Sequence, residues 1–137
     1  MRGQRVIIIA AAMATFVLLQ GCKTFEKDIR TVTNSFLESY FSVDYVTAGS
    51  FCSENLAQEL SESLKSLDSL EPTVKEMLVR QSKGVKTEII SVDRMESRDS
   101  AEVLYKIVLP NFPSGIENRL IFARTDKKNW KIVSLGR

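Results

Sequence analysis

The stretch from Asp99 to Leu109, DSAEVLYKIVL, decides the fold of this 137-residue chain. Its side chains alternate between two faces, which is the pattern of a β-strand that lies with one face on a core. One of these faces carries the apolar set Val103, Tyr105, Ile107 and Leu109. The spacing therefore predicts a strand over 101–109.

Three further segments have the same strand character, and short polar turns separate them. They cover residues 85–95, 116–125 and 130–135, with turns at 96–100, 110–115 and 126–129. Connections this short join antiparallel neighbours, so the sequence predicts a four-stranded antiparallel meander. Phe112 falls in the second turn and is expected either to fold back onto the sheet or to contact a partner or the membrane.

The residues before position 85 repeat with a helical period instead. Apolar side chains recur at steps of three and four from Phe25 to Phe41, which predicts a first helix. A short helical turn is expected at 44–48, Ser53 is expected to cap a second helix, and Pro72 to open a third that ends at Gly84. Helices followed by strands indicate the α+β class, with the helices packed on the sheet.

The alternation also assigns residues to the two faces of the sheet. The face toward the helices is expected to carry Val103, Tyr105, Ile107, Leu109, Leu120, Phe122, Trp130 and Ile132. The opposite face mixes charged residues with the apolar residues Leu104, Val108, Ile121, Val133 and Leu135. This is more apolar surface than a monomer normally exposes. We therefore expect either that a second copy of the chain (a homodimer) or a protein partner covers this face, or that the face stays exposed to solvent.

Three segments together resemble the nuclear transport factor 2-like superfamily. They are SFLESYFSVDY at 35–45, DSAEVLYKIVL at 99–109 and RTDKKNWKIVSL at 124–135. The closest resemblance is to small bacterial lipoproteins of unassigned function within that superfamily, and it covers most of 25–135. It implies a cone in which N-terminal helices close over a curved antiparallel sheet, often with a pocket and frequently with a dimer formed through the sheet.

Four aromatic residues are candidates for a ligand pocket, although such a set more often forms ordinary core: Tyr40, Tyr105, Phe122 and Trp130. Enzymes of that superfamily usually place a histidine or an aspartate in the pocket, but the sequence contains no histidine. With two cysteines and no histidine, neither a cofactor nor a metal site of ordinary zinc type is expected, and no catalytic residue is assigned. Cys52 is expected to be a small buried residue.

The N-terminal segment has the character of an export signal. Arg2 and Arg5 precede Val6 to Leu19, a run of 14 residues that is apolar except for Thr15. Such a helix reaches about 21 Å, which is short of the roughly 30 Å hydrocarbon core of a bilayer. A basic start and a short apolar run therefore favour a signal peptide over a spanning helix.

The residues that follow, Leu19-Gln20-Gly21-Cys22, resemble the lipobox of bacterial lipoproteins. The resemblance implies cleavage between Gly21 and Cys22 and attachment of acyl chains to Cys22. Two alternatives are an uncleaved membrane anchor and an ordinary secretory signal with a Cys22–Cys52 disulfide. Lys23 stands where an aspartate would retain the protein at the inner membrane, so the periplasmic face of the outer membrane is expected if the organism has two membranes.

These observations divide the chain into a signal peptide at 1–21, a lipidated tether at 22–24 and an α+β domain at 25–137. The tether reaches only about 10 Å, so the domain is expected to sit directly on the membrane. Without Arg2 and Arg5 the chain carries 17 basic and 17 acidic residues, a balance that argues against nucleic-acid binding.

The expected function is a non-catalytic binding or accessory module of the cell envelope. It would hold a small apolar ligand or a protein partner near the membrane to which its lipid anchor attaches it. Two alternatives stay open: an enzyme that acts on a small hydrophobic substrate through carboxylate and tyrosine groups, and a purely structural lipoprotein.

Overall fold

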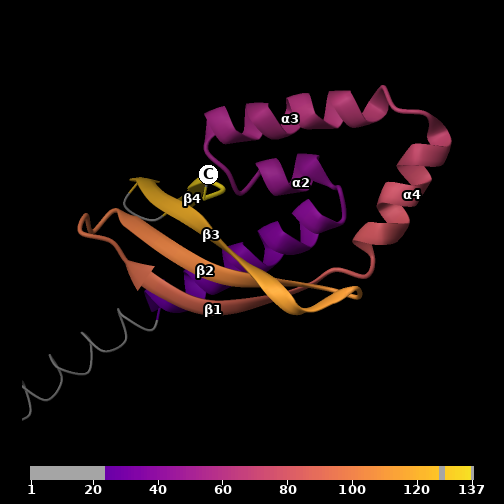
Figure 1. Ribbon diagram of the computed structural model, residues 1–137. Coiled ribbons are helices and arrows are strands. Elements are labelled where there is room, and N and C mark those ends of the chain that lie inside the picture. The colour runs from indigo at the N-terminus through magenta and orange to yellow at the C-terminus, as the bar shows by residue number, and fades with distance from the viewer. Residues whose placement is uncertain (1–23, 127–128, 137) are drawn as a thin grey trace, which may run out of the picture.

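The computed structural model describes residues 24–126 and 129–136 as helices that lead into a single sheet (Figure 1). Residues 24–41 are helical and form what we call the first helix. The later helices are α2 (Tyr45–Gly49), α3 (Glu54–Asp68) and α4 (Pro72–Ser82). The strands are β1 (Lys86–Arg94), β2 (Ser100–Leu109), β3 (Phe112–Asp126) and β4 (Asn129–Ser134). This order confirms the predicted α+β class.

The four strands pair in chain order, β1-β2-β3-β4, and each pair is antiparallel. The predicted meander is therefore confirmed. The pairing shifts between Ile89 and Ser91, so Ile90 is an extra residue in β1 that interrupts this edge of the sheet. The other edge is partly closed, because Cys52 forms an isolated parallel bridge with Ile132 of β4.

The turn between β2 and β3 is shorter than the sequence indicated. Leu109 pairs with Phe112, which leaves only Pro110 and Asn111 between the strands, so the predicted loop at 110–115 is wrong. Gly115 explains why β3 can continue through this region. Its φ is +76°, and a Cβ there would lie 2.6 Å from Cγ of Lys106, so only glycine fits this irregular stretch without strain.

Two of the predicted helix signals are confirmed. The side chain of Ser53 accepts a hydrogen bond from the backbone N–H of Leu56 and caps α3. Pro72 is the first residue of α4, where its missing N–H costs nothing. α2 has a cap that was not predicted, because the Asp44 carboxylate accepts from the backbone N–H of Thr47 at 3.2 Å.

The first helix ends at a turn that lacks the usual glycine. The backbone N–H of Asp44 donates to the carbonyl of Ser39 at 2.9 Å, and that of Val43 donates to the carbonyl of Tyr40 at 3.2 Å. These two bonds define a Schellman motif, whose left-handed position is normally glycine. Here that position is Val43, with φ of +64°, so a β-branched residue adopts a strained backbone conformation.

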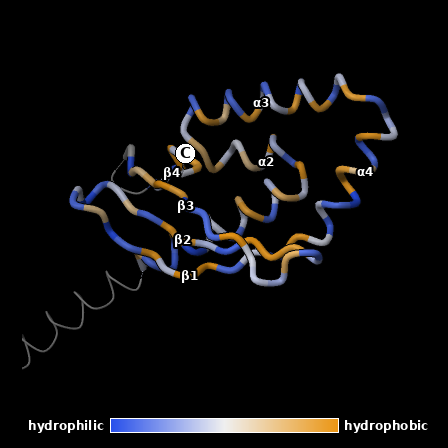
Figure 2. The backbone as a smooth tube through the Cα atoms, in the orientation of Figure 1, coloured by the Kyte–Doolittle hydropathy of each residue, from blue (hydrophilic) through white to orange (hydrophobic). Residues whose placement is uncertain are grey.

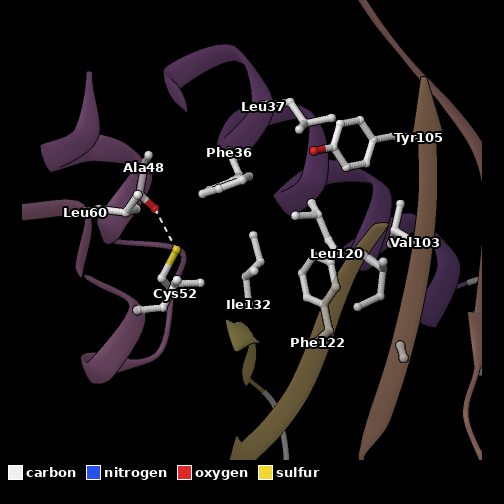
Figure 3. Packing of buried hydrophobic residues seen from close by; sticks show 13 residues of the cluster. Phe36, Leu37, Ala48, Cys52, Leu60, Val103, Tyr105, Leu120, Phe122 and Ile132 are labelled. Atoms are coloured by element: carbon white, nitrogen blue, oxygen red, sulfur yellow. Dashed lines mark hydrogen bonds between the residues drawn. The ribbon is translucent and has the colours of Figure 1, made fainter. Parts of the chain in front are cut away.

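The core lies between the helices and one face of the sheet. Figure 2 shows hydrophobic and hydrophilic residues alternating along the strands and recurring from turn to turn along the helices. In Figure 3, Leu37 of the first helix lies beside Tyr105 of β2, and Phe36 belongs to the same cluster as Leu120 and Phe122 of the sheet. The fully buried residues also include the predicted inner-face residues Val103 and Ile132.

The apolar residues predicted for the outer face of the sheet are partly covered within the single chain. Leu104, Val108 and Ile121 are already half-buried within the single chain, and Val133 is 37% exposed. Leu135 was assigned to this face, and that assignment is wrong because the residue packs against the core. It follows the end of β4, where the chain no longer obeys the alternation of a strand.

Candidate functional site

A cavity of about 160 Å³ lies between the end of the first helix and the inner face of the sheet. The first helix contributes Phe36, Tyr40 and Phe41 to its wall, and the sheet side contributes Tyr105, Ile107, Asn118 and Leu135. Of the four aromatic residues predicted to form a pocket, this cavity brings together Tyr40 and Tyr105. It is named the tyrosine cavity below.

The other two predicted pocket residues lie elsewhere. Phe122 is fully buried in the core and fills space rather than lining a cavity. Trp130 lies toward the end of the sheet where the described part of the first helix starts, and its ring meets that of Phe25 edge-on, with centroids 5.3 Å apart. The structure therefore divides the predicted set into a pair at the tyrosine cavity, one core residue and one residue at the opposite end.

Tyr40 is the centre of an aromatic cluster at the tyrosine cavity. Its ring centroid lies 5.4 Å from that of Phe36, 5.2 Å from that of Phe41 and 5.4 Å from that of Tyr45. Contacts at these separations add to the stability gained by burying the rings. All three tyrosines of the chain, Tyr40, Tyr45 and Tyr105, belong to this region of the fold.

Burial keeps the phenols near the cavity protonated. The pKa of Tyr105 is raised to about 12, mainly by desolvation and also by the neighbouring Tyr40. Desolvation and the proximity of Tyr40 likewise raise the pKa of Tyr45. At neutral pH these side chains are therefore hydrogen-bond donors rather than bases.

Asn118 and Leu135 are cavity residues that the sequence analysis missed. Asn118 lies opposite Tyr105 in the β2–β3 register, and its side chain moderates the rise in the Tyr105 pKa. The sequence does contain a signal for Asn118. Its position, two residues before Leu120 and four before Phe122, places it on the same inward face of the strand, and asparagine is unusual inside a strand. Leu135 could not be found in this way, because it follows the last strand.

Gly136 fixes the path that brings Leu135 to the cavity. Its φ is +78°, and a Cβ at this position would lie 2.5 Å from the carbonyl oxygen of Arg119. Its backbone N–H donates to the Ser134 hydroxyl at 3.2 Å. The chain therefore crosses closely over β3 at a place that only glycine fits.

A second, more polar cleft of about 310 Å³ adjoins the tyrosine cavity, and the two share Tyr40 and Leu135. Leu56 and Leu60 of α3 are apolar members of its wall, and Asn55, Glu59 and Ser63 are polar members. Glu59 is exposed to solvent. The pair of hollows therefore runs from an aromatic interior to a polar opening between α3 and the end of β4.

A third hollow, of about 680 Å³, lies beside Trp130 and is lined by polar and apolar residues of the first helix, the 50–51 segment and β4. Two arginines contact the aromatic pair of Phe25 and Trp130 at this end of the sheet. The guanidinium carbon of Arg94 lies 4.0 Å from the ring centroid of Phe25, and that of Arg124 lies 5.4 Å from the centroid of Trp130. This arrangement ties the described start of the first helix to the ends of three strands.

Cys52 is buried, as predicted. Its thiol donates to the carbonyl oxygen of Ala48 at 3.3 Å (Figure 3), and burial raises the pKa of the thiol to about 12. Lys131 opposes this rise only partly. A thiol held in its protonated form does not act as a nucleophile.

The acidic residues at the β1–β2 turn serve the fold. Asp99 accepts hydrogen bonds from Arg124 at 2.8 and 3.1 Å and so connects this turn to β3. Asp93 and Glu96 are exposed. Among residues 24–126 and 129–136, no group of three or more Asp, Glu, His or Cys side chains is placed to hold a metal ion.

The predicted lipid-attachment residue Cys22 and the cleavage residue Gly21 lie outside the described residues, as does the rest of the signal peptide. Thr24, the last residue assigned to the tether, is already helical. Within the described part of the chain, no helix has the length and the apolar character needed to cross a membrane. Comparisons with protein-family models, with curated proteins and with solved structures found no match for this chain.

Proposed function

We propose that this chain is a lipid-anchored, non-catalytic binding or accessory module of the bacterial cell envelope. The observation that carries the proposal is the lipobox-like sequence Leu19–Cys22, which is followed within two residues by the described helix. Acylation of Cys22 would hold the domain against the membrane, because so short a connection leaves little room for it to move away. Lys23 favours the periplasmic face of the outer membrane in an organism with two membranes.

The tyrosine cavity supports a binding role. It is lined mainly by aromatic and aliphatic side chains, with a few polar groups, and this composition is typical of small-molecule sites. In this proposal the ligand is small and apolar. The finer assignment to a nuclear transport factor 2-like cone is part of the same proposal, and it is supported by a first helix that packs on one face of a four-stranded antiparallel sheet.

Several features favour binding over catalysis. The sequence contains no histidine, and the raised pKa values of Cys52 and Tyr105 make both groups harder to ionise than an ordinary thiol or phenol. The enzymatic alternative rests on Glu59, a carboxylate that shares the polar cleft with Tyr40. Glu59 is open to solvent there, whereas a general acid or base of this type is normally tuned by burial.

In the second form of this proposal, the module binds a protein partner or a second copy of the chain instead of a small ligand. The outer sheet face is the surface proposed for it, with the half-buried residues Leu104, Val108 and Ile121. This face also carries an ion pair between Arg119 and Glu102, at 3.7 Å. A mixed surface of this kind suits a reversible contact better than a permanent one.

Metabolic labelling with palmitate in a bacterium with two membranes tests the anchor. We expect label in the full chain, none in Cys22→Ser and an undiminished signal in Cys52→Ser, which is the matched control because it removes the other cysteine. Mass spectrometry of the envelope fraction should find a mature chain that begins at an acylated Cys22. An unlabelled protein with intact residues 1–21, or one with a Cys22–Cys52 disulfide, would contradict the proposal.

A further inference from the structure

The hydrogen-bonding groups of the tyrosine cavity are oriented in a definite way. The backbone N–H of Arg119 donates to Oδ1 of Asn118 at 2.8 Å. With its oxygen engaged, the Asn118 amide has its nitrogen, which is a donor, to offer Tyr105 across the strand pair, and Asn118 lowers the pKa of Tyr105, as a donor beside a phenol oxygen does. A donor beside the phenol oxygen leaves the hydrogen of Tyr105 available to another acceptor.

The Tyr105 side chain is placed to offer this hydrogen to a ligand. The residue is only 4% exposed, and its ring reaches from β2 toward the first helix with the hydroxyl at the helix side (Figure 3). Tyr105 belongs to the wall of the tyrosine cavity, together with Tyr40. A buried donor gains most when a matching acceptor replaces solvent beside it.

The size and charge of the cavity restrict the ligand further. A cavity of about 150 Å³ holds a benzene-sized molecule, and the tyrosine cavity has about 160 Å³. Its described lining residues include no lysine or arginine that could compensate a buried anion, and no carboxylate that could compensate a buried cation. Burial of an uncompensated charge is costly, so a neutral molecule fits.

We infer that the tyrosine cavity binds a small neutral aromatic molecule that carries a carbonyl oxygen, and that the hydroxyl of Tyr105 donates a hydrogen bond to this oxygen. The ring of the ligand would lie among Phe36, Tyr40 and Phe41, where aromatic side chains already pack against one another at 5.2–5.4 Å. The inference rests on the proposed binding function and adds the chemical class of the ligand.

Two probes of equal size isolate the role of the carbonyl group. Acetophenone and isopropylbenzene have the same number of non-hydrogen atoms, but only acetophenone has an acceptor oxygen. Each is titrated into the full acylated chain in one detergent, and binding is followed by the NMR shifts of the methyl groups of Ile107 and Leu135. We expect acetophenone to bind about five- to tenfold more tightly than isopropylbenzene, which is the range of one net hydrogen bond.

Two variants assign this preference to one hydroxyl. Tyr105→Phe should abolish the preference for acetophenone, whereas Tyr45→Phe should retain it, because Tyr45 packs on Tyr40 but does not line the cavity. Partition of the probes into detergent is the same for all three proteins, so it does not affect the comparison.

Equal binding of both probes, or a preference that survives in Tyr105→Phe, would overturn the assigned ligand class and leave the binding module in place. Absence of shifts with either probe would overturn the ligand site itself. Failure of the lipid anchor is detected separately, by the palmitate labelling of Cys22.

Discussion

At the scale of single residues, burial decides the chemistry of groups that look reactive in the sequence. Cys52 stands just before a helix, where a thiol can be activated, yet its side chain points into the core and donates to Ala48. Tyr105 is likewise a buried donor rather than an acid with an ordinary pKa. In both cases the surrounding apolar packing favours the protonated form.

The raised pKa of Cys52 predicts a loss of stability at alkaline pH. An unfolded cysteine ionises near pH 8.5, whereas the folded thiol has a pKa of about 12. Below pH 8.5 both states are protonated and the stability is complete. Above it the unfolded state loses its proton first, so the free energy of unfolding falls progressively as the pH rises toward 12.

Urea unfolding of the wild type and of Cys52→Ala between pH 7 and pH 10.5 measures this contribution. The variant should be less stable at pH 7 but should lose less stability as the pH rises, so the two curves converge. Tyr45 and Tyr105 titrate in both proteins and cancel in the difference. Parallel curves would show that the Cys52 thiol ionises equally easily in the folded and the unfolded chain.

Single residues also mark the limit of what the sequence could predict. The buried state of Cys52 followed from the absence of a histidine partner, and the inward position of Tyr105 followed from the alternation in β2. Leu135 was placed on the wrong face because alternation holds only within a strand, and β4 ends at Ser134. Its real position depends on Gly136 and on the carbonyl of Arg119, a contact that no local pattern contains.

At the scale of elements, the helix ends show where local sequence preferences decide the structure. The strand connections show where long-range pairing overrides those preferences. The caps at Ser53 and Pro72 could be predicted because each is satisfied within its own helix. The β2–β3 turn could not, because two prolines and a glycine over 110–115 have the composition of a loop. The long-range pairing of Leu109 with Phe112 outweighs that local preference.

The Schellman turn after the first helix predicts an unusual order of stability between two variants. Val43→Ala and Val43→Gly remove the same packing of a half-buried side chain almost equally. Alanine keeps the cost of a left-handed residue, whereas glycine does not, so Val43→Gly should be more stable than Val43→Ala by about 1 kcal/mol. Urea unfolding of the two proteins measures the difference, and a more stable alanine variant would contradict the left-handed conformation.

The helix α3 and the segment after it predict a sharp contrast between two leucines. Leu60 is 4% exposed and belongs to the core, whereas Leu70 follows the helix and is 38% exposed. Leu60→Ala should lower the free energy of unfolding by about 2–5 kcal/mol, because it leaves a cavity. Leu70→Ala should lower it by less than about 1 kcal/mol. Similar losses in thermal or urea unfolding would mean that this end of α3 is covered by further contacts.

At the scale of the whole molecule, the two ends of the sheet have different surroundings. The described start of the first helix lies at the end that contains Trp130, since Phe25 contacts the Trp130 ring. The β2–β3 turn, with Phe112 exposed at 48%, lies at the other end (Figure 1). Arg124 pairs with Trp130, and the stretch of β3 from Arg124 to Phe112 runs beside about ten residues of β2, which corresponds to about 33 Å.

The position of the first helix at one end of the sheet predicts which end of the domain faces the membrane. Cys22 precedes Phe25 by three residues, a reach of about 10 Å, so acylation of Cys22 would bring Trp130 close to the lipid headgroups. Because Trp130 is the only tryptophan of the chain, its fluorescence reports on this end alone. In vesicles that contain the acylated protein, a quencher attached to lipid headgroups should strongly reduce its emission.

The matched control moves the tryptophan to the opposite end of the sheet. In the double variant Trp130→Phe and Phe112→Trp the reporter lies about 33 Å further along β3, and headgroup quenchers should affect it little. A water-soluble quencher provides the complementary measurement and should reach the exposed position 112 at least as well as position 130. If headgroup quenching is equal at both positions, the domain is not held by the Trp130 end, and the short tether inferred from Cys22 does not orient it.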